Sequence, residues 1–147
     1  MNVLLLEEVF NEKSKISAKL TDYGLSKIFD CSKSQVTMTN CGTSQWTAPE
    51  VLRGEKYGVK ADIYSFAILM WEVFSQKIPY TELKLNQTQI AIQVVNRKIR
   101  PNLNLLLKDT PEEFKQLITN CWDEEPNLRP DAEKICKEIK SYINNLG

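Results

Sequence analysis

One apolar segment in the middle of the chain constrains the fold more than any other feature of the sequence. Eleven of the fifteen residues at positions 61–75 are apolar, and they surround the axis of a helix instead of forming one stripe. A helix of this kind lies either at the centre of a domain or in a membrane. Fifteen residues interrupted by Asp62 and Glu72 are too few to cross a bilayer. We therefore expect a buried central helix.

The chain before this segment predicts a hairpin and a long loop. Apolar residues at 3–6 and 16–20 flank a polar turn at 11–14, which is the pattern of two paired strands. Residues 22–50 then show little periodicity and much Ser, Thr, Asn and Gln. A loop of this length within a compact domain is usually functional or disordered.

The chain after the central segment predicts further helices. A weak pattern covers residues 89–96. Thr110 is expected to cap the next helix, with Pro111 at its first position and Glu113 completing a capping box. The last helix is expected to begin near Asp131. Its apolar face would consist of Ala132, Ile135, Cys136, Ile139, Tyr142, Ile143 and Leu146.

The charge balance excludes two classes of partner. The 147 residues suit a single domain, and 19 basic residues balance 19 acidic ones, so the net charge is zero. A nucleic-acid arm or a polybasic membrane patch needs clustered positive charge. We expect neither nucleic acid nor a membrane as a partner.

The absence of histidine and the pattern of cysteines narrow the chemistry. A chain with no histidine cannot hold a Ser-His-Asp triad, a Cys-His nucleophile or a histidine zinc site. The four cysteines form no C-x-x-C pair and are too sparse for a disulfide scaffold. The apolar run at 3–6 is too short for the core of a signal peptide. A reducing, cytoplasmic setting is expected.

Four short motifs follow one another along the chain. They are Asp-Tyr-Gly from Asp22, Ala-Pro-Glu ending at Glu50, Asp-Ile-Tyr-Ser-Phe from Asp62, and a Cys-Trp to Arg-Pro stretch from Cys121. A lone D-x-G after a strand is usually a turn. All four together, in this order and at this spacing, resemble the C-terminal lobe of a eukaryotic protein kinase of the tyrosine-kinase-like group.

The resemblance covers essentially the whole chain and implies an α+β, mostly α fold. Residues 1–147 would be a partial protein kinase domain with an N-terminal hairpin and helices around a buried central helix. Residues 22–50 would be its activation segment. The implied activity is transfer of a phosphoryl group from ATP, with Mg²⁺, to protein serine or threonine.

By this resemblance, Asp22 and Asn2 would be the ligands of Mg²⁺ on the ATP phosphates. Oxygen ligands suit this hard cation. Leu4 would form the apolar floor beneath the adenine of ATP. Tyr23 stands where the family usually has phenylalanine.

The implied activation segment carries the substrate-positioning residues. Gly42, Thr43 and Trp46 resemble the serine/threonine-specific form of that loop, whereas tyrosine-specific kinases usually carry a proline-containing sequence there. Hydroxyl groups in the same segment are expected as phosphorylation sites: Ser32, Ser34, Thr37 and Thr39.

Two structural roles also follow from the resemblance. Glu50 and Arg129 are expected to form a buried ion pair, for which the planar guanidinium is suited. Asp62, inside an apolar helix, is expected to need a hydrogen-bonding partner, because an unpaired buried carboxylate is costly. In the family, that partner is the backbone of the catalytic loop.

Several catalytic parts of the family are absent from these residues. In the family motif H-R-D-L-x-x-x-N the catalytic base stands five residues before the closing asparagine, so with Asn2 in that place the base would lie upstream of Met1. No G-x-G-x-x-G occurs in the chain. We expect the 147-residue chain alone not to turn over ATP. Met1 fits an internal methionine of a longer protein as well as a true start.

In the resembling proteins, helices that precede the catalytic loop cover one side of the buried helix, and these residues do not include them. Part of the 61–75 helix should be open to water, which favours self-association, capture of a protein partner or marginal stability. The alternatives to an enzyme portion are a catalytically dead docking module, presenting the activation segment and the 89–96 helix, and a gene remnant without activity.

Overall fold

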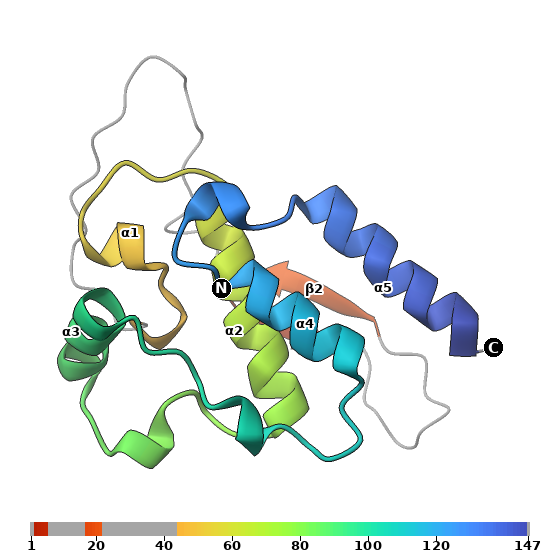
Figure 1. Ribbon diagram of the computed structural model, residues 1–147, viewed down its shortest axis with the longest axis horizontal. Helices are drawn as coiled ribbons and strands as arrows, with labels where there is room; N and C mark the ends of the chain where they lie inside the picture. Colours follow the sequence, from red (N-terminus) through yellow and green to blue (C-terminus); the bar gives the residue numbers. More distant parts are fainter. Residues whose placement is uncertain (1, 6–16, 22–43, 147) are drawn as a thin grey trace. The chain divides into compact units, whose positions relative to one another are not determined.

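The computed structural model describes residues 2–5, 17–21 and 44–146. Two compact units make up the chain, Met1–Lys33 and Ser34–Gly147. The described strands lie in the first unit and the described helices in the second (Figure 1). This confirms the predicted composition, which is mostly helical with a small hairpin.

The first unit contains an antiparallel pair of strands. Strand β1 (Asn2–Leu5) pairs with β2 (Ala18–Thr21), and the register places Asn2 opposite Thr21 and Leu5 opposite Ala18. The hairpin predicted from the sequence is therefore present, although β2 begins two residues later than expected. The predicted turn at 11–14 lies outside the described residues.

The second unit is built from helices joined by short turns. Its α-helices are α1 (Pro49–Leu52), α2 (Lys60–Ser75), α3 (Gln87–Arg97), α4 (Glu112–Cys121) and α5 (Ala132–Leu146). Its 3-10 helices are η2 (Ser44–Trp46), η3 (Thr81–Leu83), η4 (Leu103–Leu105) and η5 (Pro126–Leu128).

Helix α2 lies at the centre of this unit, beside α4 (Figure 1). Trp71 is fully buried, and its indole N–H donates to the backbone oxygen of Asn102 at 3.1 Å. The helix is not buried on every side, since Asp62 is exposed and Val73 is 55% exposed. The sequence predicts a central helix of which part is open to water, so this exposure does not contradict the prediction. The main core around it contains Ala48, Ala61, Tyr64, Ala67, Ile68, Met70, Trp71, Leu106, Leu117, Ile118, Cys121, Trp122 and Ile135.

Helix α3 is longer and better capped than the sequence suggested. The side chain of Asn86 accepts a hydrogen bond from the backbone of Gln89 at 2.9 Å, and the Gln89 side chain accepts one from the backbone of Asn86 at 3.0 Å. This reciprocal capping box satisfies two backbone donors at the helix start. Ile90 and Val94 on α3 form a second small core with Tyr80.

The capping box predicted for α4 is wrong. The helix begins at Glu112 after an extended Pro111, and no side-chain hydrogen bond caps it. Thr110 is buried instead, and its hydroxyl has no hydrogen-bond partner among the described residues. Its backbone N–H donates to Leu107 at 3.0 Å, which closes a turn before the helix.

Helix α5 buries less of its predicted apolar face than expected. Ile135 is buried, whereas Ile139 and Tyr142 are half-buried. Cys136 is exposed and Ile143 is 58% exposed. The helical period is therefore correct, but the rest of the described unit covers only part of that face.

Candidate functional site

A buried ion pair joins the end of the predicted activation segment to the turn before α5. Arg129 and Glu50 are 1% and 3% exposed. The guanidinium binds the carboxylate through two parallel bonds, from Nη1 to Oε1 at 2.7 Å and from Nη2 to Oε2 at 2.9 Å. This is the pair expected from the sequence, formed by residues 79 positions apart.

The remaining donors of Arg129 bind backbone oxygens. Its Nε donates to Asp123 at 2.8 Å, Nη1 donates to Lys60 at 2.9 Å and Nη2 donates to Glu124 at 3.3 Å. Together with the two bonds to Glu50, these use all five N–H donors of a guanidinium. Arg129 thus ties α1, the start of α2 and the 123–124 turn together.

A second charged cluster stands beside this pair. Glu124 accepts from Arg53 at 2.8 Å and from Arg100 at 2.9 Å. Burial acts to raise the pKa of Glu124, but the hydrogen bonds from Arg100 and Arg53 prevail and lower it. The guanidinium carbons of Arg100 and Arg129 lie 5.0 and 5.2 Å from the centre of the Tyr64 ring, within cation–π range.

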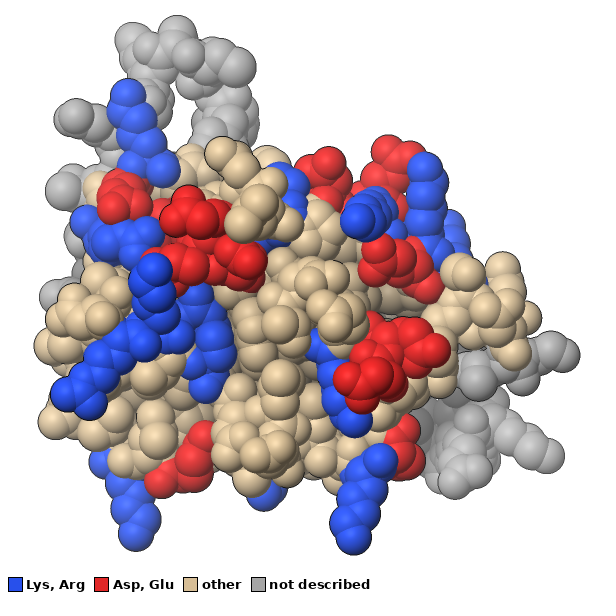
Figure 2. Space-filling view, viewed as in Figure 1, with Lys and Arg blue, Asp and Glu red and all other residues tan. Residues whose placement is uncertain are grey.

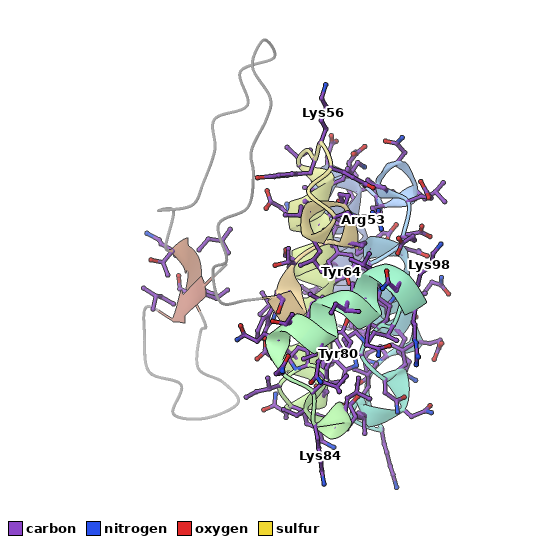
Figure 3. All side chains as sticks on the ribbon, turned by 90° about the vertical axis from the view of Figure 1, so that its left-hand side faces the viewer. Arg53, Lys56, Tyr64, Tyr80, Lys84 and Lys98 are labelled. Atoms are coloured by element: carbon purple, nitrogen blue, oxygen red, sulfur yellow. The ribbon has the colours of Figure 1, made fainter. Side chains whose placement is uncertain are left out.

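Two tyrosines lie inside the helical unit near these arginines. Figure 3 shows Tyr64 and Tyr80 within the unit, while Lys56, Lys84 and Lys98 extend toward its edges. Burial raises the pKa of both phenols. They are therefore neutral, structural groups at physiological pH.

The predicted substrate-positioning residue Trp46 is held by the central helix. Its indole N–H donates to Glu72 at 3.0 Å, and its backbone oxygen accepts from the Ser65 hydroxyl at 2.7 Å. Ser44, two residues earlier, donates to the backbone oxygen of Gln87 at 2.9 Å. The described end of the segment is therefore attached to both α2 and α3.

Some predicted site residues lie outside the described part of the chain. These are Asp22, Gly42, Thr43 and the four hydroxyl residues Ser32, Ser34, Thr37 and Thr39. The structure gives only the backbone of Asn2, which pairs with Thr21, the residue before Asp22 in the sequence. Leu4, predicted to contact adenine, is 55% exposed in β1.

Asp62 differs from its sequence-based description. It is exposed in the first turn of α2, where water solvates the carboxylate and the helix N-terminus favours negative charge. Because the carboxylate is exposed in the part of the chain that the structure describes, it does not need the hydrogen-bonding partner that a buried carboxylate would need. A role of Asp62 toward a catalytic loop stays a prediction.

No group of three or more His, Cys, Asp or Glu side chains in residues 2–5, 17–21 and 44–146 could hold a metal ion. None of the helices found there is long and apolar enough to cross a membrane.

Comparison with known proteins identifies the family. The model of the protein kinase domain matches residues 1–139. The chain therefore belongs to the protein kinase domain family, in agreement with the resemblance carried by its four motifs.

Individual relatives bear matching names. The chain is 40% identical over 124 residues to the probable serine/threonine-protein kinase drkC of Dictyostelium discoideum, an alignment covering 84% of the chain. It is 32% identical over 129 residues to the serine/threonine-protein kinase STY17 of Arabidopsis thaliana, covering 88%. The probable serine/threonine-protein kinase roco8 of Dictyostelium discoideum is 35% identical over 148 aligned residues, covering 98%. The chain spans only 16%, 21% and 8% of the lengths of these relatives.

Sequence reasoning missed the cluster around Glu124 and the bond from Trp46 to Glu72. Arg53, Arg100 and Glu124 are far apart in the sequence and share no periodic pattern. Glu72 did carry a signal, since a carboxylate inside an apolar helix needs a nearby donor.

Proposed function

We propose that this chain is the C-terminal-lobe portion of a serine/threonine protein kinase of the tyrosine-kinase-like group. The reaction is transfer of the γ-phosphoryl group of ATP to a protein hydroxyl, with Mg²⁺. The names of the relatives and the Gly42-Thr43 sequence before Trp46 support serine and threonine as the acceptors. A cytoplasmic location is part of the same proposal.

The register of the hairpin is the observation that carries this proposal. Asn2 lies opposite Thr21, which is the residue that directly precedes the second proposed Mg²⁺ ligand, Asp22, in the sequence. Asparagine and aspartate supply the oxygen ligands that Mg²⁺ prefers. Bound there, Mg²⁺ would neutralise charge on the phosphate oxygens of ATP.

The 147 residues alone are proposed to be inactive. They contain no H-R-D motif, because they contain no histidine, and no glycine-rich phosphate loop. Phosphoryl transfer depends on positioning and electrostatic stabilisation, which these parts provide. The isolated chain should therefore give no Mg²⁺-dependent transfer that survives repurification.

A docking module is the second candidate, and one observation favours it. Ile92 on α3 is 51% exposed, and Leu83 on the preceding η3 is 42% exposed. Such apolar groups could contribute to a protein-binding surface. In that case the protein would hold a partner through α3 without transferring phosphate.

The test uses the protein as its own cell makes it. It is incubated with Mg²⁺, radiolabelled ATP and myelin basic protein, and the labelled amino acids are identified. The proposal expects labelled serine and threonine. Asp22→Asn should lower the rate about 100-fold or more, since a metal contributes several kcal/mol of transition-state stabilisation.

Two controls separate the candidates. Asp109→Asn, at an exposed position in the turn before α4, should leave the rate unchanged. An intact protein that transfers no phosphate, yet retains a partner that Ile92→Asp releases, would contradict the kinase proposal and support docking.

A further inference from the structure

An open groove runs between α4 and α5, and none of the residues discussed for phosphoryl transfer is among its lining residues. Its volume is about 650 Å³, which is within the size range of small ligand sites. Its apolar surface comes from Phe114, Leu117, Ile139 and Tyr142. The Phe114 and Tyr142 rings meet edge to face with centres 5.0 Å apart, so these aromatic groups are held in place by each other.

Carboxylates form the charged part of the groove lining. Glu112, Glu113 and Glu138 line it, and no lysine or arginine does. Glu112 is paired with Lys115 at 3.0 Å, while Glu138 is 3.9 Å from Lys134. Both pairs are on the solvent side and contribute little, and Glu113 has no ion pair within residues 44–146. Figure 2 shows acidic side chains over α4 and α5, with basic groups between them.

The lining determines the kind of ligand that fits. An anion would meet three carboxylates in a lining that contains no lysine or arginine, and a purely apolar group would gain nothing from those carboxylates. A ligand with an apolar or aromatic anchor flanked by positive charge satisfies both surfaces, because it fills the aromatic part and pairs with the carboxylates.

We propose that the α4–α5 groove binds a basic peptide segment of a partner protein. An apolar side chain of that segment inserts between Phe114 and Ile139, and flanking lysine or arginine residues pair with Glu113 and Glu138. The proposal does not depend on phosphoryl transfer, since the groove shares no residue with the ion pair of Glu50 or with the hairpin.

The test measures binding of defined synthetic peptides to the full protein by fluorescence anisotropy. The probe is the labelled peptide Lys-Leu-Lys-Phe-Lys-Leu-Lys. One comparison peptide has glutamate for every lysine, and the other has serine for leucine and phenylalanine. Only the first should bind saturably, and added salt should weaken its binding.

Charge variants test the carboxylates. Glu113→Gln and Glu138→Gln should each weaken binding about two- to fivefold, the size expected for an exposed ion pair. Glu133→Gln is the matched control, because Glu133 also lies on α5 and is exposed but does not line the groove. Its affinity should equal that of the parent.

A variant that fills the groove separates binding in the groove from general attraction to an acidic surface. Ser141→Trp, at an exposed lining position, keeps every charge and should abolish binding. If this variant fails the circular dichroism check for folding, Gln116→Trp on the opposite wall replaces it.

Four results would overturn the proposal. One is equal binding of the acidic peptide, and another is unchanged binding by the folded tryptophan variant. The third is a concentration-dependent dimer that Ser141→Trp converts to a monomer, because the groove would then be occupied by a second copy. Absence of any saturable binding by the basic probe would also refute it.

Discussion

Replacing Arg129 by methionine should be among the most destabilising single changes in the helical unit. The guanidinium is buried and donates five hydrogen bonds, two to Glu50 and three to backbone oxygens. Methionine occupies a comparable volume but donates none of them. The variant would leave the Glu50 carboxylate, itself 3% exposed, buried without its counter-charge.

The expected loss in the free energy of unfolding follows from the groups that would remain without a donor, namely the Glu50 carboxylate and three backbone oxygens. Removing one partner of a buried ion pair costs about 3–5 kcal/mol. Each buried carbonyl that loses its donor adds about 1 kcal/mol or more where water cannot reach it. With three such carbonyls, we expect a total of about 6 kcal/mol, which is the whole stability of a marginal domain. Arg129→Lys should also be costly, because an ammonium has three donors and cannot form the two parallel hydrogen bonds that the planar guanidinium makes to Glu50.

Urea unfolding followed by tryptophan fluorescence measures this cost. The double variant Glu50→Gln with Arg129→Met should recover part of the loss, since it no longer buries a charge, but not all of it, since the backbone oxygens remain unpaired. Lys137→Met is the control, because its pair with Glu133 is exposed and should change stability by no more than about 0.5 kcal/mol. A folded Arg129→Met variant within about 1 kcal/mol of the parent would refute the reasoning.

Three further outcomes are expected. Burial raises the pKa of Cys121 to about 12, so mass mapping after iodoacetamide treatment at pH 8 should find the exposed Cys136 labelled and Cys121 protected; labelling of both at equal rates in folded protein would be inconsistent with this. Asn86→Ala removes the capping bond to Gln89 and should lower the free energy of unfolding by about 1 kcal/mol in urea titrations, whereas no change would mean that the cap is not stabilising. The folded-state pKa of Glu124 is lowered, so its contribution is present above the unfolded pKa of about 4.3 and is lost as the pH falls through the folded value; Glu124→Gln should flatten the loss of stability in acid, and an unchanged pH profile would count against it.

The helices were predictable where the pattern was strong. The apolar run at 61–75 predicted α2 to within one residue, because so long a run has few other possible structures. Helices α2 and α3 are followed by Gln76 and Lys98 at φ 55° and 54°. Glycine is the usual residue in this left-handed conformation, so neither helix end carried its ordinary signal.

The capping errors have a physical explanation. Thr110 and Asn86 both precede helices, and both have a suitable partner three residues later. Thr110 is buried one residue before Pro111, which stands at the N-cap position, and its hydroxyl makes no hydrogen bond to the helix, whereas Asn86 is exposed and caps α3. A capping motif shows that a bond can form, but tertiary packing decides whether it does.

The contacts of the site could be predicted only where a sequence motif implies them. Glu50 and Arg129 could be paired from the sequence because each belongs to a recognisable motif, and the motifs imply the contact. The fourth motif also contains Glu124, but its two arginine partners, Arg53 and Arg100, come from separate segments outside the four motifs, so nothing in the sequence indicated these contacts.

The apolar face of α5 shows why a correct helical period does not predict burial. The period places Ile135, Ile139 and Ile143 on one side of the helix, yet exposure rises along this series from 3% at Ile135 to 58% at Ile143. The beginning of α5 follows Arg129, whose five bonds fix the preceding turn, whereas its later half meets α4 through the Phe114 and Tyr142 rings. The helix is thus anchored firmly at one end, and the groove between α4 and α5 lies where the packing is looser. The period of a sequence determines which side chains share a face, but how much of that face is buried depends on surface that other segments must provide.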